Sequence, residues 1–305
     1  MPKDWRVYTE QILERCASLI QFRIWGDFNS SQLRRWMNNF TTDEERYFAA
    51  CVLDSLIYRS KDQTLALIRQ LFQRSLPDLT RLAPLSTGPI EDWQELLQAN
   101  PVSGDPGLRI VAVVQSSDPP GKSAQVMARY MMQDLSIDKH WLINPWEMRR
   151  HAKAGCNIFV FIDDFLGTGN QFEEVVESER LRPLFASTYC VYAPLVAHVE
   201  GMEYLRSTYN ELRLSPVEEL DDSYGLFHAT SKAFDDQTNT PESAKDFYYE
   251  LLKKKGIRIR GPERRGYGHL ELAYAFEHAT PDNNLPILWW RKKPWEPLFK
   301  HRPGS

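Results

Sequence analysis

Near its middle the chain contains the segment Phe159-Val160-Phe161-Ile162-Asp163-Asp164-Phe165-Leu166-Gly167-Thr168-Gly169-Asn170. Its apolar first part, together with Asn157 and Ile158, predicts a buried strand that ends in two carboxylates. A short loop with two glycines follows, and a helix is expected from Gln171 onward. This order of strand, loop and helix indicates an α/β fold, in which ligands bind beyond the ends of the strands.

The loop carries groups that suit a sugar phosphate. Asp163 and Asp164 can accept hydrogen bonds from both hydroxyls of a ribose, and they are the candidate ligands, direct or through water, of a Mg²⁺ ion. Glycines permit tight turns and close approach of the backbone, and helix N-termini bind phosphate. The candidate phosphate-binding residues are Gly167, Thr168, Gly169, Asn170 and Gln171. A simpler interpretation is that the acidic pair only caps a turn.

The pattern on either side of this segment extends the α/β interpretation. Strands are expected at 109–114, 141–143, 157–163, 189–196 and 212–214, with helices through 126–131, from 171 onward and over 202–209. Such alternation implies right-handed crossovers and a largely parallel sheet. The sequence therefore predicts a parallel-sheet α/β fold with its chemistry in the loops that follow the strands.

The loop after the first strand, residues 115–124, is the second candidate region. Gly121, Lys122 and Ser123 could give backbone donors and one positive charge to a diphosphate. A P-loop ATPase is a competing interpretation, although that motif requires glycine where this chain has Ser116, and two prolines of the loop lack N–H groups. A solvent-exposed, proline-rich turn is the third interpretation.

Residues 1–100 predict an α-helical N-terminal domain, for which the winged-helix type is one option. Within it, Thr42 followed by Glu45 has the pattern of a capping box. A turn-rich stretch leads up to Gly107, so residues 101–305 are expected to form the ligand-binding domain with a C-terminal extension. In that extension we expect a helix over 246–255 and a strand over 270–276.

Composition narrows the classes of protein. The chain has 305 residues, 42% of them hydrophobic, which is enough to bury a large core. Its net charge of −4 gives no general attraction to nucleic acid or anionic membranes, so such a partner would need a local patch. The apolar runs are too short for a membrane span and the N-terminus lacks a signal-peptide pattern, so a cytoplasmic protein is expected. Its four isolated cysteines are expected to be reduced thiols.

The central segment resembles the phosphoribosyltransferases, whose signature is an apolar strand, two acidic residues, two apolar residues and a loop rich in threonine and glycine. Asp163 and Asp164 match the acidic pair, and Thr168-Gly169 matches the centre of the loop. Three positions depart from the pattern: Gly167, Asn170 and Gln171, of which the last removes a hydroxyl donor. The resemblance implies a 5-phosphoribosyl diphosphate or nucleotide ligand, with residues 115–124 as the diphosphate loop.

More of the chain resembles a narrower bacterial family. The segments that carry this resemblance are 28–36, 39–40, 54–58, 266–270 and 277–289. The family is the phosphoribosyltransferase-like group of biological-conflict systems, which includes retron-associated members in anti-phage defence. The resemblance implies an effector or regulatory subunit whose partners would be a reverse transcriptase with its DNA–RNA product, or a helix-turn-helix protein. It leaves the possibility of an oligomer open.

Some further groups are candidates for the same function. By the resemblance, residues 144–153 fall where family members have a flexible loop that closes over the substrate, and its cations could neutralise diphosphate or simply be solvated: Arg149, Arg150 and Lys153. A hood over the ligand, or a local backbone cap, could come from His278, Asp282, Asn283 and Asn284.

The basic cluster at 253–265 could bind a phosphate backbone, against a solvated surface as the simpler interpretation. Trp295 near the basic tail is expected to be exposed and could anchor an interface.

Three functional hypotheses follow. The first is an enzyme that holds a Mg²⁺-bound phosphoribosyl ligand on Asp163 and Asp164 and stabilises the departing diphosphate electrostatically. The second is a subunit that senses a nucleotide without turnover, which the altered Gly167 and Gln171 positions favour. The third is an ATPase that depends on Lys122.

Overall fold

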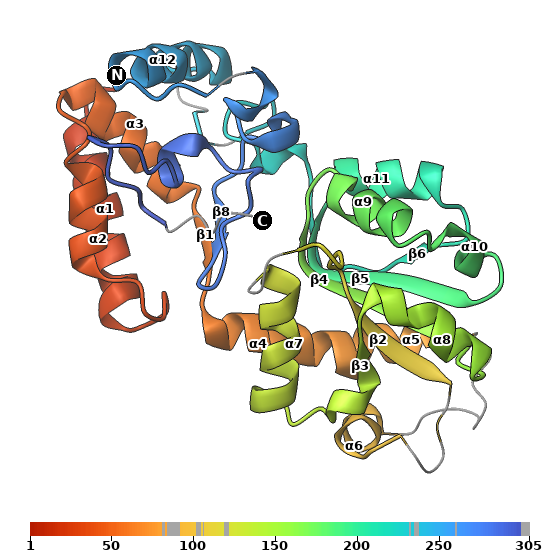
Figure 1. Ribbon diagram of the computed structural model, residues 1–305. Helices are drawn as coiled ribbons and strands as arrows, with labels where there is room; N and C mark the ends of the chain where they lie inside the picture. The colour runs from red at the N-terminus through yellow and green to blue at the C-terminus, as the bar shows by residue number, and fades with distance from the viewer. Residues whose placement is uncertain are drawn as a thin grey trace. The chain divides into compact units, whose positions relative to one another are not determined.

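The structure, a computed structural model, describes residues 1–80, 83, 92–101, 105, 107–118, 122–231, 233–234, 238–259 and 261–299. The chain forms two compact units, which are both drawn in Figure 1. The first unit combines Met1–Asp62 with the part of the chain that begins at Asp221, and the second unit is Gln63–Leu220. The second unit is therefore inserted into the sequence of the first.

The second unit is built on a parallel sheet, as the sequence predicted. Among the described residues the strands lie in the order β3-β2-β4-β5-β6, and β7 pairs with β5 farther along that strand. Every pairing in this sheet is parallel. The strands are β2 (Leu108–Ala112), β3 (Leu142–Ile143), β4 (Ile158–Leu166), β5 (Tyr189–His198), β6 (Arg213–Leu214) and β7 (Glu218–Leu220).

Helices cover both faces of this sheet. On one face, Phe161 and Tyr192 pack with Phe172 of α9 (Asn170–Ser178), and α10 (Arg182–Phe185) and α11 (Val199–Thr208) complete the layer. On the other face, Ala112 packs with Ala124 of α7 (Ser123–Asp134). Figure 1 shows α9 and α11 on the side of β4 and β5 opposite to α7. Successive side chains of a strand point to opposite faces of the sheet. A strand such as β2 therefore contributes side chains to both layers, Val111 to one and Ala112 to the other.

The strand order creates a switch point between β2 and β4. These strands are neighbours, but the chain continues from β2 outward to β3 and from β4 outward in the other direction to β5. In parallel sheets, the crevice for ligands lies beyond the carboxyl ends of two such strands. The loops that follow β2 and β4 are the two candidate regions of the sequence.

Strand β4 is longer than predicted. The strand was expected to end at Asp163, but its ladder with β5 continues through the pairs Phe165↔Val196 and Leu166↔Ala197. The acidic pair therefore lies inside the strand and not at its end. The sequence gives little sign of this because the extension depends on the length of the neighbouring strand.

The segment at 144–153, expected as a flexible loop, is helical. A 3₁₀ turn, η3 (Pro145–Glu147), leads into α8 (Met148–Lys153). The Glu147 carboxylate accepts a hydrogen bond from the backbone N–H of Asn144 at 3.0 Å, which is one half of a capping box. The capping chemistry of Asn144 and Glu147 explains why the loop is ordered.

The second unit also contains elements that precede the sheet or connect its strands. A helix that begins as α4 continues through a π-helical segment into α5, and a short helix follows before β2. These elements are α4 (Lys61–Gln70), η1 (Leu71–Ser75), α5 (Leu76–Thr80), α6 (Trp93–Gln98) and the 3₁₀ turn η2 (Lys139–Trp141).

The boundary expected near residue 100 falls inside the second unit. Two hydrogen bonds attach α6 to the segment before β3: Asp138 N donates to Leu97 O at 2.8 Å, and Trp141 Nε1 donates to Ala99 O at 2.8 Å. The turn-rich stretch around residue 100 therefore connects elements of one unit.

The first unit is mainly helical, in agreement with the prediction for the N-terminal part. Its helices are α1 (Trp5–Gln21), α2 (Ser30–Met37), α3 (Asp43–Asp54) and α12 (Pro241–Lys254), with 3₁₀ turns η4 (Asp222–Tyr224), η5 (Gly261–Glu263), η6 (Tyr267–His269) and η7 (Pro286–Leu288). Two short strands, β1 (Ile57–Arg59) and β8 (Tyr274–Phe276), form a parallel pair. Strand β1 was not predicted, and β8 is shorter than the strand expected at 270–276.

Only half of the expected capping box forms at α3. The Thr42 hydroxyl accepts a hydrogen bond from Glu45 N at 3.3 Å. The Glu45 carboxylate bonds instead to the Thr41 N–H at 2.6 Å and to Lys254 and Lys255 of the α12 end. Glu45 therefore joins the start of α3 to the end of α12.

Trp295 is buried, so the prediction of an exposed interface anchor is wrong. Its side chain is 3% exposed, its indole N–H donates to Ile287 O at 3.1 Å, and its ring packs edge-on against Phe40. A buried tryptophan needs this kind of partner for its N–H group.

Two predictions from composition can be compared with the structure. All four cysteines are buried free thiols. Within the described ranges, no helix combines the length and the apolar character that a membrane crossing requires.

Candidate functional site

Both candidate loops lie at the switch point of the sheet. The loop from Gln115 to Lys122 follows β2 and leads directly into α7, and the loop from Gly167 to Gly169 follows β4 and leads into α9. The sheet thus brings together the N-terminal ends of two helices, where free backbone N–H groups and the helix dipole favour an anion.

Asp163 is enclosed by its own unit. It is 1% exposed; its Oδ1 accepts a hydrogen bond from Asp164 N at 2.9 Å, and Gln171 Nε2 and Tyr192 OH each lie 3.5 Å from its Oδ2. Burial raises the pKa of Asp163 well above its usual range, the negative charge of Asp164 raises it further, and Lys122 lowers it. The surroundings of Asp163 therefore favour its protonated form more than water does.

The acidic pair, Asp163 and Asp164, differs in solvent exposure from the candidate phosphate loop, residues 167–171, which is called the phosphate loop below. Asp164 is 4% exposed, so both carboxyl groups are nearly closed to solvent, whereas Thr168, Asn170 and Gln171 are half-buried. A sugar could reach Asp164 only if neighbouring atoms moved aside.

Close packing against α11 fixes the phosphate loop. Gly169 has a φ of 92°, which favours glycine, and a Cβ atom there would lie 2.8 Å from Tyr204 Cδ1. Gly201 of α11 is packed still more tightly, because a Cβ atom on it would lie 2.2 Å from the Gly167 carbonyl oxygen. Tyr204 also donates a hydrogen bond of 2.5 Å to Glu173 in the first turn of α9. The loop and both helices form one packed arrangement.

Sequence reasoning did not identify Tyr192 and Gly201 as parts of this site. Tyr192 is 1% exposed, burial raises its pKa, and its ring stacks on Phe172 with 4.3 Å between centroids. A tyrosine within an otherwise apolar predicted strand was the available signal, since a buried hydroxyl needs a partner. Gly201 gave no such signal, because its role depends on the approach of the Gly167 backbone.

The loop after β2 holds Lys122 in an ion pair. Lys122 Nζ lies 2.9 Å from Asp118 Oδ1, with the side chains only 14% and 10% exposed. The other oxygen of Asp118 accepts a hydrogen bond from Gln115 N at 2.8 Å, and Ser116 N donates to Glu179 Oε1 at 2.9 Å. Asp118 thus partly neutralises the positive charge of Lys122. This charge nevertheless lowers the pKa of Asp163.

The remaining candidates of this loop can be placed only in part. Ser123 is half-buried and is the first residue of α7. Gly121 lies outside the described residues, as do the two prolines before it.

Two of the cations of α8, Arg149 and Arg150, contact protein groups. Arg149 Nη2 donates at 2.5 Å to the carbonyl of Arg180, just beyond the C-terminal end of α9. Arg180 follows Glu179, whose carboxylate accepts the hydrogen bond from Ser116 N of the loop after β2, so Arg149 is bonded next to a residue that this loop contacts. Arg150 pairs with Glu147 at 2.9 Å. Because this segment is helical, the flexible loop expected here is wrong, and a role of these arginines in neutralising diphosphate stays a prediction.

The residues proposed as a hood belong to the first unit and cap backbone groups there. Asn284 Nδ2 donates to Pro281 O at 2.7 Å, and Asn283 Nδ2 donates to Tyr267 O at 3.0 Å. His278 is buried, and burial raises the pKa of Asp282 to about 6. These contacts fit the alternative of a local cap, and a hood role stays a prediction.

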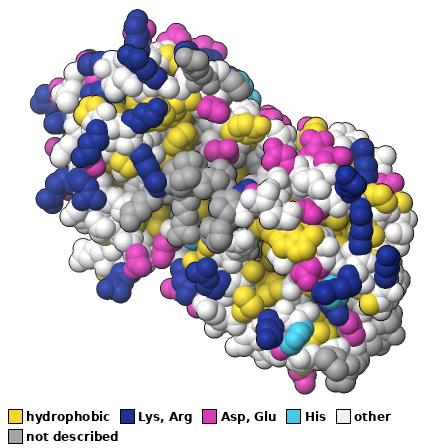
Figure 2. Space-filling model, viewed as in Figure 1, with side chains coloured by type: hydrophobic (Ala, Val, Ile, Leu, Met, Phe, Trp, Pro, Cys, Tyr) yellow, Lys and Arg dark blue, Asp and Glu magenta, His cyan; other side chains and the backbone are white. Residues whose placement is uncertain are grey.

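Three cations of the basic cluster at 253–265 are paired with two carboxylates of the first unit. Lys254 and Lys255 lie 2.6 and 2.7 Å from the Glu45 carboxylate, and Arg265 pairs with Glu271. Arg260 lies outside the described residues. On the face drawn in Figure 2, acidic side chains also occur among the basic ones over both units. These pairs give three of the cations a structural role, and phosphate-backbone binding by the cluster stays a prediction.

A comparison with models of protein families identifies the family to which the chain belongs. The model of the PRTase-CE family matches residues 33–301, which include both candidate loops and parts of both units. The chain belongs to the PRTase-CE family. As a PRTase-CE protein it is phosphoribosyltransferase-like, as the acidic pair and the Thr168-Gly169 loop predicted. No curated protein matches this PRTase-CE chain.

Proposed function

We propose that this PRTase-CE protein binds 5-phosphoribosyl diphosphate or a related nucleotide at the switch point of its second unit. The observation that carries the proposal is that the loops into α7 and α9 follow two neighbouring parallel strands, β2 and β4, and that the charge of Lys122 lowers the pKa of the buried Asp163 of β4. The 5-phosphate would bind Thr168, Gly169, Asn170 and Gln171, and the diphosphate would bind Gly121, Lys122 and Ser123. This arrangement would place the ribose between the loops.

The two carboxyl groups would have different roles. Asp164 is the carboxylate that would accept hydrogen bonds from the ribose hydroxyls. Asp163, which is more deeply buried and has a raised pKa, would orient Asp164 through the bond from Asp164 N to Asp163 Oδ1. Tyr192 and Gln171 would hold Asp163 in turn.

The donor set fits a Mg²⁺ ion that arrives with the ligand. Magnesium is usually held by one or two carboxylates together with substrate phosphates and water, and Asp164 could supply such a carboxylate. In the described part of the chain, no group of three or more His, Cys, Asp or Glu side chains is placed to hold a metal. When bound, the ion would neutralise charge on the diphosphate.

The first form of the function is enzymatic. The bond between the ribose C1 and the diphosphate oxygen would break, and the electron pair would leave with the diphosphate. Lys122, Ser123 and the N-terminal N–H groups of α7 would stabilise that charge. Water or a base would then bond to C1 and release its proton to solvent.

The second form is a sensing subunit that binds without turnover. Three observations favour it: Lys122 is already paired with Asp118, both carboxyl groups are nearly closed, and Gln171 replaces a hydroxyl residue of the family pattern. Such a subunit would act inside a larger complex.

One experiment separates the two forms. The purified protein would be incubated with labelled 5-phosphoribosyl diphosphate, NAD and nucleotides in the presence of Mg²⁺, and both binding and product release would be measured. Diphosphate or base release that is lost in Asp164→Asn and Thr168→Val supports an enzyme. Saturable binding without product, weakened by the same variants, supports a sensor. The matched control Asp246→Asn changes an exposed aspartate of α12 and should alter neither quantity. If none of these compounds binds, the proposal fails in both forms.

We further propose that the protein is an effector of a bacterial anti-phage defence system of the retron type. Support comes from family membership and from the resemblance of the segments at 28–58 and 266–289 to defence-associated proteins. Its partners would be a reverse transcriptase with its DNA–RNA product, or a helix-turn-helix protein. Plaque assays on cells that carry the complete neighbouring operon test this, since Asp164→Asn should abolish protection while leaving the protein level unchanged. Equal plaque numbers with and without the operon would contradict it.

The ATPase hypothesis makes a separate prediction. Lys122 would have to reach ATP phosphates, and Lys122→Ala would then abolish ATP hydrolysis. The ion pair with Asp118 disfavours this role. Full hydrolysis by the variant, or none by the unmodified protein, would exclude it.

A further inference from the structure

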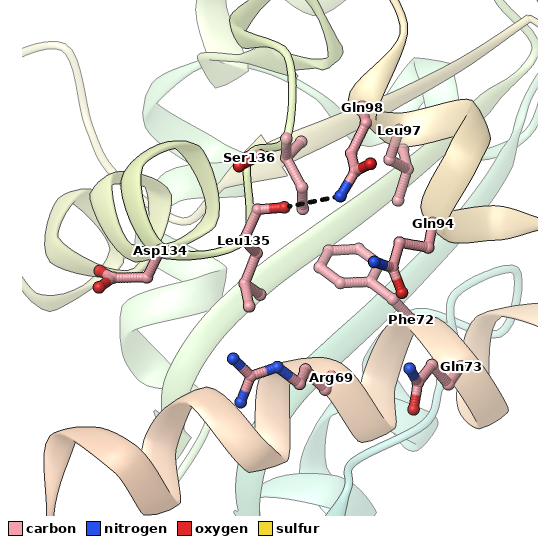
Figure 3. A pocket seen from close by; sticks show the side chains of 10 residues that line it. Arg69, Phe72, Gln73, Gln94, Leu97, Gln98, Asp134, Leu135 and Ser136 are labelled. Carbon is pink, nitrogen blue, oxygen red and sulfur yellow. Dashed lines mark hydrogen bonds between the residues drawn. The ribbon is translucent and has the colours of Figure 1, made fainter.

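The second unit contains a pocket at the end of α7 opposite to the candidate phosphate site. It has a volume of about 180 Å³ and lies between the α4–η1 helix, α6 and the turn after α7 (Figure 3). Helix α7 has 12 residues and spans roughly 18 Å, from Ser123 at the candidate phosphate site to Asp134 at this pocket. The pocket is therefore separate from the switch point.

The walls of the pocket present carboxamide groups. Gln94 and Gln98 are four residues apart on α6, so they project from the same face of that helix, and Gln73 comes from η1 on the facing side. In Figure 3, Gln94 lies beside the ring of Phe72, and Gln98 points toward the turn. Gln98 Nε2 donates a long bond of 3.4 Å to Leu135 O, which a ligand could replace. Each carboxamide offers both a donor and an acceptor.

The floor of the pocket is apolar and aromatic. Phe72 and Ile137 are 5% exposed and Leu97 is 1% exposed, so the ring and its neighbours form a dry base under the polar rim. Phe72 belongs to the π-helical segment Leu71–Ser75, which interrupts an otherwise α-helical run. Such segments are rare and occur frequently at functional sites, because the widened turn re-aims side chains.

The charges at the rim balance each other. Arg69 and Asp134 both line the pocket, and they contribute one positive and one negative charge. This balance suits a neutral ligand better than a phosphate or a carboxylate, in contrast to the switch point with its two helix N-termini.

We propose that this pocket binds a nucleobase or its nucleoside. A flat heterocycle would stack on Phe72, and its edge donors and acceptors would bond to the carboxamides of Gln94 and Gln98, as glutamine does with adenine. The volume corresponds to about six water molecules at ~30 Å³ each, which suits a ring system with few substituents. The argument does not depend on the proposed function of the switch point.

The test measures binding of adenine, guanine, uracil and their nucleosides to the full-length protein by isothermal titration calorimetry. We expect one site per chain for at least one of these compounds. Gln94→Leu and Gln98→Leu each remove a carboxamide at similar size and should weaken that binding about fivefold. Phe72→Leu keeps the floor apolar but removes the ring, and should weaken it about tenfold. Adding a 5′-phosphate to the nucleoside should not strengthen binding at this pocket, and any tighter binding that the phosphate adds should be weakened in Thr168→Val.

Controls distinguish this pocket from the switch point. Gln70→Leu makes the same change at an exposed position of α4 outside the pocket and should leave affinity unchanged, as should Asp164→Asn. Circular dichroism establishes that each variant is folded. The proposal is overturned if none of the compounds binds. It is also overturned if Asp164→Asn abolishes binding while the pocket variants keep it, because the base would then occupy the switch point.

Discussion

At the scale of single residues, Asp163 couples the stability of the second unit to pH. Its carboxyl has a pKa of about 3.9 in an unfolded chain, and burial raises the pKa well above that value in the folded protein. Because the folded state binds the proton more tightly, the contribution of this group to stability is complete below about pH 4 and is lost as the pH rises through the folded-state pKa.

We therefore expect Asp163→Asn to be more stable than the unmodified protein at pH 8 and about equally stable at pH 4. The amide cannot ionise, so the cost of burying a charge at high pH disappears. Chemical denaturation across this pH range measures the free energy of unfolding. Asp246→Asn is the exposed control and should follow the unmodified protein. If the free energy of unfolding of Asp163→Asn depended on pH in the same way as that of the unmodified protein, Asp163 would not be a buried carboxyl that binds a proton on folding.

Gly201 is expected to be intolerant of a single added carbon. The Cβ atom of Gly201→Ala would lie 2.2 Å from the Gly167 carbonyl oxygen, so the backbone of the phosphate loop or of α11 must move. We expect a loss of about 2 kcal/mol in the free energy of unfolding, as for other overpacked sites. Thermal and chemical denaturation measure it. Glu203→Ala, at an exposed position of the same helix, should change stability by less than about 0.5 kcal/mol. Equal stabilities for the two variants would contradict the close packing.

The candidate site residues that the sequence could indicate are contiguous. Asp163, Asp164 and Thr168 lie within one motif whose order and spacing carry their chemistry. Tyr192 and Gly201 come from β5 and α11, and only the folded sheet brings them to the loop. A motif can reveal what a segment can bind, but not which distant groups pack around it.

At the scale of elements, Glu45 joins two helices of the first unit. Burial alone would raise its pKa, but hydrogen bonds from Lys254, Lys255 and the Thr41 N–H lower it to about 2. The unfolded value is about 4.3, so this group contributes stability above about pH 4, and the contribution is lost as the pH falls toward 2.

We expect Glu45→Gln to lower the free energy of unfolding by about 2 kcal/mol at pH 7, because Lys255 would keep a partly buried charge without its carboxylate partner. The difference from the unmodified protein should shrink as the pH approaches 2. Urea denaturation at pH 7 and pH 3 measures both effects. Glu44→Gln changes the exposed neighbour and is the matched control. If Glu45→Gln and Glu44→Gln showed the same stability, the contacts of Glu45 with Lys254 and Lys255 would not stabilise the protein.

Elements with strong local patterns were predicted more successfully than those that depend on neighbours. Strands β2 to β6 and helices α7, α9 and α11 followed from apolar runs and their alternation, and α12 was expected from its helical spacing, whereas β7, α8 and α10 were not predicted. The end of β4 was missed because its last pairs depend on β5, and β1 was missed because three residues carry too little pattern. The π-helical segment at Leu71–Ser75 likewise looks like ordinary helix in the sequence.

At the scale of the whole molecule, the division into units predicts which fragment is stable. The second unit, residues 63–220, contains its entire sheet and both helical layers. We expect this fragment to unfold cooperatively on heating when expressed alone. The fragment 101–305, cut at the boundary suggested by the turn-rich stretch, lacks α4, η1 and α6 and should be less stable. Circular dichroism and limited proteolysis of both fragments test this, and a more stable 101–305 fragment would contradict the division.

The turn-rich stretch misled the sequence analysis for a physical reason. Proline and glycine mark turns, but a turn between elements of one unit has the same composition as a linker. The inserted unit begins near the start of α4 and ends after β7. Neither junction, Asp62-Gln63 or Leu220-Asp221, contains a proline or a glycine.

The pairing of β1 with β8 has a consequence for synthesis on the ribosome. Residues 57–59 emerge early, while their partner at 274–276 emerges only after the whole inserted unit has been translated. During that interval the nascent chain exposes the backbone edge of β1, which other chains can pair with. Chains that end before Tyr274, whether from truncated mRNAs or from proteolysis, should therefore have a folded second unit and an aggregation-prone N-terminal segment.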